Sequence, residues 1–498
     1  MKKAAIILVL FFSLYPISIF CLEESIMIGR EHEWKDVNFE LSRNIAFQPG
    51  RGGFSDVLLK EAEYPTDRET DMLLHFNHSP HFDETGHYDV LGGNVTPKVS
   101  RYGGGAALFQ RENVISITPR PGALFSPGSE WRDFSIEFWL YPANLEEGEV
   151  IFFWQGSDQR GSKPITQQVI CTVRDRSLLW EFNNFFHPPD GGEYRIELTG
   201  ESRLVPRKWK HHLIRFDSTT GLLEYLVDQV PEGIVYASKS KHEDGTVFLP
   251  GTGRFSSEPI KIGENFTGII DEFRIMRRFV RAPRVSKYKK TGGYLVTNLF
   301  DLGYSGSRLV SIDPRHRIPE NTEILYFYQM TDIARPLGPD EEGWTMIEPG
   351  ELAGIEAEGR YVQLMVQFFP DGTGNETPVL SEIILTYEPD FPPTVPSGIS
   401  AEPGDGSVTL VWNPVADTDV GGYMVYYGDA PGSYFGKGSS LGNSPVDVGN
   451  VTEVTLEGLE NGRLYYFSIV AYDDSVPPHY GSFSREVSTR PVRSRGRQ

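Results

Sequence analysis

Short runs of alternating apolar and polar residues recur through most of the chain and are separated by turns rich in Gly, Pro and Asp. In one such run, Phe134, Ile136 and Phe138 fall on one face of an extended strand, and Ser135 and Glu137 fall on the other, because successive strand side chains point to opposite faces. A period of two predicts β-strands, and regularly spaced turns predict sandwiches or jelly rolls. The pattern predicts an all-β protein.

The strand runs fall into more than one group. A chain of 498 residues is too long for one hydrophobic core and is expected to form three or four domains. Residues 71–282 hold a dense series of runs and are predicted to form one domain. Residues 284–389 are predicted to form a second β-sandwich, because the alternating run 361–368 is followed by a turn and another run at 383–387.

Three segments lie outside these strand groups or between them. The Pro-rich stretch 389–396 is extended and is expected to be a semi-rigid linker to a third domain at 392–490. Residues 22–70 are polar, show no sustained period and are expected to be a lead-in segment. Residues 491–498 are expected to be a solvated basic tail.

The N-terminus has the pattern of a secretory signal. Two lysines precede a mainly apolar run from Ala4 to Phe20, which predicts that residues 1–21 are a signal peptide and that the protein is exported. Acylation of Cys21 is an alternative, although Phe20 is larger than the residue that usually precedes a lipidated cysteine. The predicted location is the periplasm or cell surface, with membrane contact only through the signal, an uncleaved anchor or a lipid on Cys21.

Composition supports this interpretation and excludes some partners. The chain contains 51 Gly and 35 Pro, as expected for turn-rich β domains. Its net charge of −21 would repel a phosphate backbone, so no nucleic-acid partner is expected. Once Cys21 is removed or modified, Cys171 is the one remaining thiol, so packing and not an internal disulfide must stabilise the domains.

The third region resembles a fibronectin type III domain over residues 392–490. The stretches 406–412 and 422–427 are similar to two framework strands of that family, and Leu459 precedes Tyr465 by six residues, as in its tyrosine corner. The resemblance implies an immunoglobulin-like sandwich in which Trp412 and Tyr465 are core residues and carry no reaction.

Residues 71–280 resemble the laminin-G-like, concanavalin-type jelly roll found in bacterial exported proteins. Five motifs carry this resemblance in the family's order: residues 73–77, 103–109, 134–142, 209–217 and 266–275. The resemblance implies a lectin-like sandwich that meets ligands on a concave sheet or at rim loops.

Aromatic rings that could stack on sugars are the predicted ligand-binding residues of this domain. The candidates are Trp154, Trp180, Phe185, Phe186 and Tyr194. Residues 183–192 depart from regular strand patterning and are a candidate binding loop. The alternative is that these large aromatics form the sandwich core.

Some members of the resembled family hold calcium, so calcium is the one expected cofactor. Asp271 and Glu272 match a recurrent acidic position of the family, and Asp83 is a weaker candidate ligand. Hydrogen bonding to a loop would explain these acids equally well.

Enzymatic signals are sparse. Glycoside hydrolases on this fold need two carboxylates about 5–10 Å apart, and the Glu-x-Asp-x-x-Glu spacing of one such group is absent. The sequence contains no HExxH motif. The histidines at 75, 78, 81 and 87 are interpreted as exposed loop residues.

The sequence therefore predicts an exported, non-catalytic binding or adhesion protein that recognises a glycan or protein at the cell envelope. Two alternatives stay open: a glycan-processing hydrolase whose acid and base come from separate strands, and a purely structural envelope scaffold.

Overall fold

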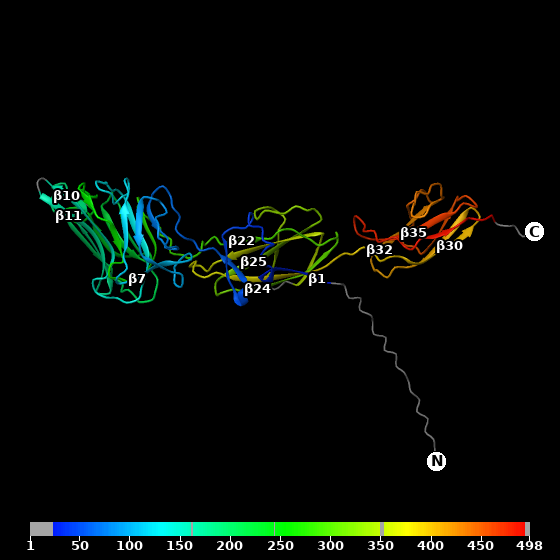
Figure 1. Cartoon of the computed structure of the whole chain (residues 1–498), viewed down its shortest axis with the longest axis horizontal. Coiled ribbons are helices and arrows are strands. Elements are labelled where there is room, and N and C mark those ends of the chain that lie inside the picture. The colour runs from blue at the N-terminus through cyan, green and yellow to red at the C-terminus, as the bar shows by residue number, and fades with distance from the viewer. Residues whose placement is uncertain (1–22, 161–162, 244, 349–352, 494–498) are drawn as a thin grey trace, which may run out of the picture.

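The computed structural model describes residues 23–160, 163–243, 245–348 and 353–493 and shows three β bodies in a row (Figure 1). Regular structure in these ranges consists of strands and two short 3-10 helices, Arg30–His32 and Arg51–Gly53. The all-β prediction is confirmed. None of the helices in the described ranges is long and apolar enough to cross a membrane. The predicted signal peptide, Cys21 and residues 494–498 lie outside the described residues.

The jelly-roll body consists of two eight-stranded sheets. The first has the order β14 (Arg195–Thr199), β12 (Ser177–Asn183), β11 (Lys163–Arg174), β10 (Val150–Arg160), β20 (Ile260–Ile262), β8 (Ile115–Pro119) and β5 (Tyr88–Gly92), with β19 (Ser256–Ser257) beside β10. The second has the order β17 (Val230–Tyr236), β16 (Leu222–Val227), β15 (Lys210–Phe216), β9 (Phe134–Pro142), β21 (Thr267–Met276), β7 (Ala106–Gln110) and β6 (Asn94–Thr96), with β4 (Thr70–Leu74) beside β21. A short ribbon pairs β13 (Phe186–His187) with β18 (Leu249–Pro250).

Alternation along β9 fills the space between these sheets. Phe138 stacks on Phe273 at 5.6 Å between ring centroids, and Phe134 stacks on Phe216 at 5.6 Å. Phe134, Phe138 and Phe273 belong to one large apolar cluster. This face of the strand is the core face that its pattern predicted.

The opposite face of β9 was expected to be a surface, but the structure buries it. Glu137 is fully buried there between Arg274 and His211, and Trp139 packs with Tyr64 in a separate small cluster. Burial opposes ionisation of Glu137, but the hydrogen bonds and charges of His211 and Arg274 outweigh it and lower its pKa to about 2. Because Arg274 and His211 pair with the charge of Glu137, this face of β9 can be buried.

The middle body has a six-stranded and a five-stranded sheet. The first contains β2 (Ile45–Pro49), β3 (Ser55–Leu59), β29 (Val379–Glu388), β24 (Arg308–Arg317) and β27 (Ala353–Glu358) in that order, with β1 (Glu24–Gly29) beside β29. The second contains β22 (Gly293–Val296), β28 (Tyr361–Phe369), β25 (Glu323–Thr331) and β26 (Thr345–Ile347), with β23 (Phe300–Asp301) beside β28.

The prediction that residues 22–70 form a lead-in segment was wrong for most of that stretch. Strand β1 pairs antiparallel with β29 along its whole length, from Glu24 opposite Tyr387 to Gly29 opposite Glu382. The N-terminal segment also supplies Trp34 and other residues to the middle core. The strand partner of β1 lies more than 350 positions away along the chain, so no local period reveals this pairing. The jelly roll is consequently inserted into the middle sandwich, whose blue and yellow-green strands lie together in Figure 1.

The C-terminal body is a smaller sandwich of three and four strands. Its sheets are β30 (Ser397–Gly404), β31 (Ser407–Asn413) and β34 (Glu453–Glu457), and β33 (Val446–Asp447), β32 (Val420–Gly428), β35 (Tyr465–Asp473) and β36 (Val487–Thr489). Trp412 and Tyr465 are both buried in its core. The Tyr465 hydroxyl also accepts a hydrogen bond from the backbone N–H of Glu460 at 3.1 Å.

Candidate functional site

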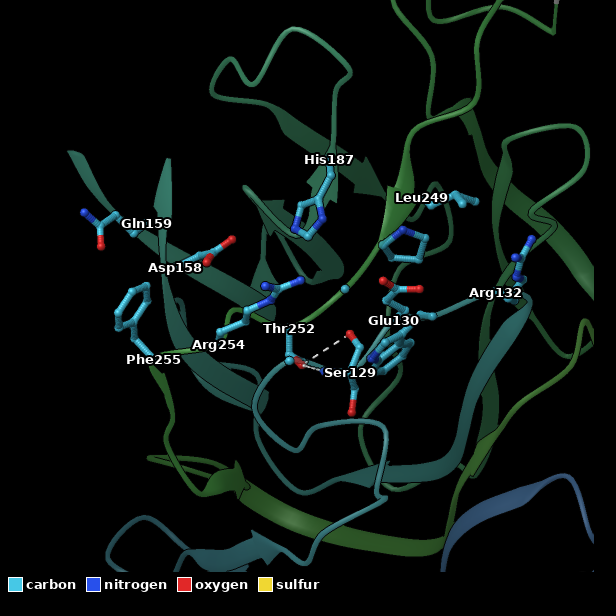
Figure 2. A pocket seen from close by; sticks show the side chains of 14 residues that line it. Ser129, Glu130, Arg132, Asp158, Gln159, His187, Leu249, Thr252, Arg254 and Phe255 are labelled. Atoms are coloured by element: carbon cyan, nitrogen blue, oxygen red, sulfur yellow. Dashed lines mark hydrogen bonds between the residues drawn. The ribbon is translucent and has the colours of Figure 1, made fainter. Parts of the chain in front are cut away.

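A cavity of about 700 Å³ opens at one end of the jelly-roll body. It lies where the loop before β9, the end of β10, the β13–β18 ribbon and the loop after β18 meet (Figure 2). We call it the rim cavity. Its lining residues are Gly128, Ser129, Glu130, Trp131, Arg132, Asp158, Gln159, His187, Leu249, Pro250, Gly251, Thr252, Arg254 and Phe255.

Hydrogen bonds fix the loops at the base of the rim cavity. The Thr252 hydroxyl accepts from the Ser129 N–H at 2.9 Å and donates to the Ser126 carbonyl at 2.6 Å. The backbone N–H of Thr252 donates in turn to the Ser129 carbonyl at 2.9 Å. Trp131 is buried beneath the loop, and its ring N–H donates to the Leu124 carbonyl at 2.7 Å. These bonds hold the base of the rim cavity in place without a ligand.

A fully buried glutamine connects the ribbon to the loop that follows it. The Gln167 amide donates to the Gly251 carbonyl at 3.0 Å, and its carbonyl accepts from the Gly253 N–H at 2.5 Å. The same amide nitrogen lies 3.0 Å from Nε2 of His187. Glycine is required at 253, because a Cβ there would lie 2.2 Å from the Ser157 carbonyl oxygen. These contacts set the position of the following residues, Arg254 and Phe255.

The mouth of the rim cavity combines charge, amide groups and apolar surface. Figure 2 shows Asp158, Arg254 and Glu130 around one space, with His187 above it. The Phe255 ring stands at the edge and is 65% exposed. An arrangement of carboxylate, guanidinium and imidazole groups beside an exposed ring can bind a polyhydroxylated ligand through hydrogen bonds and one apolar contact.

The five aromatic candidates from the sequence do not form this site. Trp154, Trp180, Phe185 and Phe186 are at most 1% exposed and belong to the jelly-roll core. Tyr194 is partly buried, packs on that core and donates its hydroxyl to the Ser238 carbonyl at 3.0 Å. The predicted stacking role for the four buried rings was wrong, because a ring at most 1% exposed offers no face to a sugar. The candidate loop 183–192 does reach the rim cavity through His187.

The three calcium candidates are divided between two places. Asp83 caps a turn after β4, where it accepts from the N–H groups of Leu73, His87 and Tyr88. Asp271, in β21, accepts instead from the N–H of Arg101 at 2.7 Å. Hydrogen bonding to a loop, the alternative to calcium binding, therefore describes Asp83 and Asp271.

Glu272 meets a histidine that was interpreted as an exposed loop residue. Nδ1 of His75 lies 2.5 Å from Oε1 of Glu272. Burial raises the pKa of Glu272, and the hydrogen bond and charge of His75 oppose that rise. Burial disfavours protonation of His75, but Glu272 and the nearby charges of Glu63 and Glu84 outweigh it, so its pKa is raised.

The residues of the rim cavity gave little signal in the sequence. They come from loops at 128–132 and 251–255 that have no period and no motif spacing. The one signal was Gly251-Thr252-Gly253 followed by a charged and an aromatic residue, because closely spaced glycines often mark close backbone contact.

The jelly-roll body is a two-sheet β-sandwich with a polar cavity between rim loops. A family model described as the concanavalin A-like lectin/glucanases superfamily, of the laminin-G type, matches residues 120–286. The matched range includes both loops that carry the rim cavity. The resemblance predicted for the jelly-roll domain is confirmed over that range.

Individual similar proteins cover parts of the chain. A Kelch domain-containing protein of Saccharolobus solfataricus is 36% identical over 115 residues, which are 23% of this chain and 14% of the relative. Domain 4 of AbnA, a GH43 extracellular arabinanase from Geobacillus stearothermophilus solved with arabinotriose, is 16% identical, with 44% of this chain and 95% of that chain covered and a TM-score of 0.27. A carbohydrate esterase of the Shiga toxin-encoding bacteriophage phi24B is 11% identical, with coverages of 41% and 97% and a TM-score of 0.26.

Proposed function

We propose that this protein is a non-catalytic glycan-binding protein and that its jelly-roll domain binds an oligosaccharide in the rim cavity. The observation that carries the proposal is the open cavity of about 700 Å³ in which an exposed phenylalanine stands beside charged and polar side chains. The match of residues 120–286 to a lectin and glucanase superfamily supports the same ligand class. The apolar N-terminal run supports export, and we place this binding at the cell envelope.

The chemistry of the cavity favours a sugar over a nucleotide or an apolar ligand. A sugar offers hydroxyls to Asp158, Arg254 and Glu130 and an apolar ring face to Phe255. A phosphate would meet Arg254 but also the two carboxylates of Glu130 and Asp158, in a chain whose net charge is −21. A neutral oligosaccharide fits this mixture best.

The experiment is an oligosaccharide array probed with the full-length protein, followed by calorimetric titration of the best ligand. Phe255→Ala and Arg254→Ala should each weaken binding by about tenfold, which corresponds to roughly 1.4 kcal/mol per variant. Phe435→Ala is the matched control, because Phe435 is an 85% exposed ring in the C-terminal body. Unchanged affinity in the two cavity variants, or no bound glycan at all, would reject the proposal.

A hydrolase is the second candidate function, because the carboxylates of Glu130 and Asp158 both line the rim cavity. Glycosidases use two such groups as acid and base or nucleophile. The ligands found on the array should be incubated with the protein, and released reducing ends should be measured for the wild type and for Glu130→Gln and Asp158→Asn. Turnover that disappears in both variants would replace the binding function with this one.

We further propose that the C-terminal sandwich is a fibronectin type III module that acts as a spacer. Its three-plus-four strand arrangement and its buried Trp412 and Tyr465 support this assignment. Deletion of residues 392–493 should leave glycan affinity unchanged if the module takes no part in binding.

A further inference from the structure

A second, smaller cavity lies on the jelly-roll body and shares no residue with the rim cavity. Its volume is about 280 Å³. It is lined by Glu63, His75, Phe76, Asn77, His78, His81, Phe82 and Glu84. Three of the four histidines that the sequence places between 75 and 87 therefore line one space.

Side chains from three separate segments meet beside this cavity, which Glu63 and His75 line and behind which Glu272 is buried. Glu63 follows β3 on the segment that enters the jelly roll, and His75 directly follows β4. Glu272 comes from β21, where pairing with β9 shifts register between Asp271 and Arg274. The Glu272 backbone has φ 51°, a left-handed conformation that is uncommon for this residue type. Bulges of this kind redirect a side chain and recur next to functional sites.

Glu63, His75 and Glu272 form a cluster with metal-ligand spacing. One donor atom from each side chain lies within 4.8 Å of the other two. The Asn77 amide donates to Oε1 of Glu63 at 2.7 Å, and the Tyr64 N–H donates to Oε2 of Glu272 at 2.9 Å. The Glu63 carboxylate is thus oriented through Oε1, whereas Glu272 is oriented through Oε2 and bonds to His75 through Oε1. Such supporting bonds are typical around metal ligands.

His81 provides an independent observation at the same cavity. It is 5% exposed, and neither ring nitrogen makes a geometrically good hydrogen bond among the described residues, although a backbone group of His78 lies near the ring. Buried polar atoms are normally paired, so two unpaired nitrogens on one ring require an explanation. The ring packs edge-on against Phe76 at 5.0 Å and against the backbone at Gly93, where a Cβ would lie 2.7 Å from Nε2. A metal ion bound beside the His81 ring would give one of these nitrogens a partner.

We propose that this cavity binds a divalent transition metal ion such as Zn²⁺, with Glu63, His75 and Glu272 as ligands and His81 as a further donor. Imidazole combined with carboxylate suits Zn²⁺, whereas Ca²⁺ takes oxygen ligands.

The metal ion would join the incoming segment to the jelly-roll body. Glu63 belongs to the segment that leaves the middle sandwich, while His75 and Glu272 belong to the jelly roll. An ion that all three bind would restrict this segment and raise the unfolding temperature of the inserted domain.

The test uses the full-length protein after chelator treatment and dialysis. Calorimetric titration with ZnCl₂ should show one site, titration with CaCl₂ should show none of comparable affinity, and Co²⁺ should give the visible absorption bands of a low-coordinate nitrogen and oxygen site. Glu63→Gln and His75→Ala should each weaken Zn²⁺ binding by about tenfold or more. His242→Ala is the control, because His242 is an exposed histidine on a different loop of the same body.

Glu63→Gln should fold normally, because Glu63 is partly exposed and glutamine preserves its shape. Misfolding would therefore not explain weaker Zn²⁺ binding in this variant. A cooperative melting transition at the wild-type temperature in metal-free buffer should accompany its weaker Zn²⁺ binding. Equal Zn²⁺ affinity in Glu63→Gln, His75→Ala and the wild type would overturn the proposal, as would tighter binding of Ca²⁺ than of Zn²⁺. The glycan assay on Phe255 is independent of either result.

Discussion

The middle sandwich is joined to its two neighbours in different ways. The jelly roll is connected by two chain crossings, between β3 and β4 and between β21 and β22, whereas the C-terminal sandwich follows a single proline-rich linker. The two crossings bond directly to each other: the Ala62 N–H donates to the Lys287 carbonyl at 2.8 Å, and the Tyr64 hydroxyl donates to the Arg284 carbonyl at 3.1 Å. Main-chain carbonyl groups of the second crossing therefore accept hydrogen bonds from the first crossing.

A loop of the jelly roll strengthens the first junction. The Arg101 guanidinium donates to the Val285 carbonyl and to the Asn375 side chain of the middle sandwich, both at 2.6 Å. The adjacent Tyr102 is fully buried, and its hydroxyl donates to the Ser286 carbonyl at 3.0 Å.

Side chains make the contacts described at the second junction. The Ser305 hydroxyl lies 3.0 Å from Nε2 of His479, and the Ser475 hydroxyl donates to Asp390 at 2.8 Å. The Tyr304 ring packs against His479 and Phe391. We therefore expect insertion to couple two domains more strongly than addition at one end, because each crossing of an inserted domain limits the motion of the other.

Trp412→Ala tests the independence of the C-terminal sandwich and has the largest expected effect. Loss of this buried ring should lower the unfolding free energy of that sandwich by about 3–5 kcal/mol. Differential scanning calorimetry of the full-length protein should show one transition that moves or disappears while the others stay in place. A joint shift of all transitions would show that the second junction couples as strongly as the first.

Ile28→Ala tests the coupling across the first junction. Ile28 is fully buried in β1, so its truncation should destabilise the middle sandwich by about 2–5 kcal/mol. Because both crossings start from that sandwich, the jelly-roll transition should also move, by a smaller amount. Met27→Ala on the same strand is the control, since Met27 is 39% exposed. A jelly-roll transition that stays fixed would contradict the proposed coupling.

The sequence predicts individual strands but not the pairing of strands that are far apart along the chain. Alternation within a strand is a local property, so the runs around Phe134 and Trp412 predicted buried strands correctly. The pairing of β1 with β29 joins segments more than 300 residues apart and leaves no local trace. The insertion could therefore not be read from periodicity.

The candidate sites show the same limit. Aromatic residue type alone could not distinguish Trp154 in the core from Phe255 at a rim, because both are large apolar rings and their exposure depends on the fold. The histidines after β4 were visible in the sequence, but their carboxylate partners Glu63 and Glu272 come from other segments. Spacing within one segment cannot reveal such a cluster.

Arg101→Ala sharpens the comparison at the first junction with a moderate effect. The variant loses the two hydrogen bonds to the middle sandwich and the contact of the guanidinium with the Trp139 ring at 4.2 Å. Hydrogen bonds from charged groups contribute about 1.5–3 kcal/mol, so a loss of this size is expected. Arg111→Ala is the control, because Arg111 forms an exposed ion pair with Glu146 on the same body and such pairs contribute about 0–1 kcal/mol. Chemical denaturation of both variants would measure the difference, and equal effects would show that Arg101 does not strengthen the junction.

Ser305→Ala addresses the second junction and has the smallest expected effect. The variant removes the hydroxyl that meets His479, while the bond of His479 to Asp473 at 2.8 Å stays in place. A hydrogen bond of this kind contributes about 0.5–1.5 kcal/mol, so the melting transitions should hardly move. The orientation of the C-terminal sandwich should change more than its stability, because few other contacts oppose rotation about a single linker. Spin labels placed on the middle and C-terminal sandwiches should therefore give a broader distance distribution in Ser305→Ala than in the wild type. Ser488→Ala, an exposed serine on β36, is the matched control and should keep the wild-type distribution. If the distribution in Ser305→Ala is as narrow as in that control, the proline-rich linker alone sets the angle between the two sandwiches, and side-chain contacts at the second junction are unimportant for it.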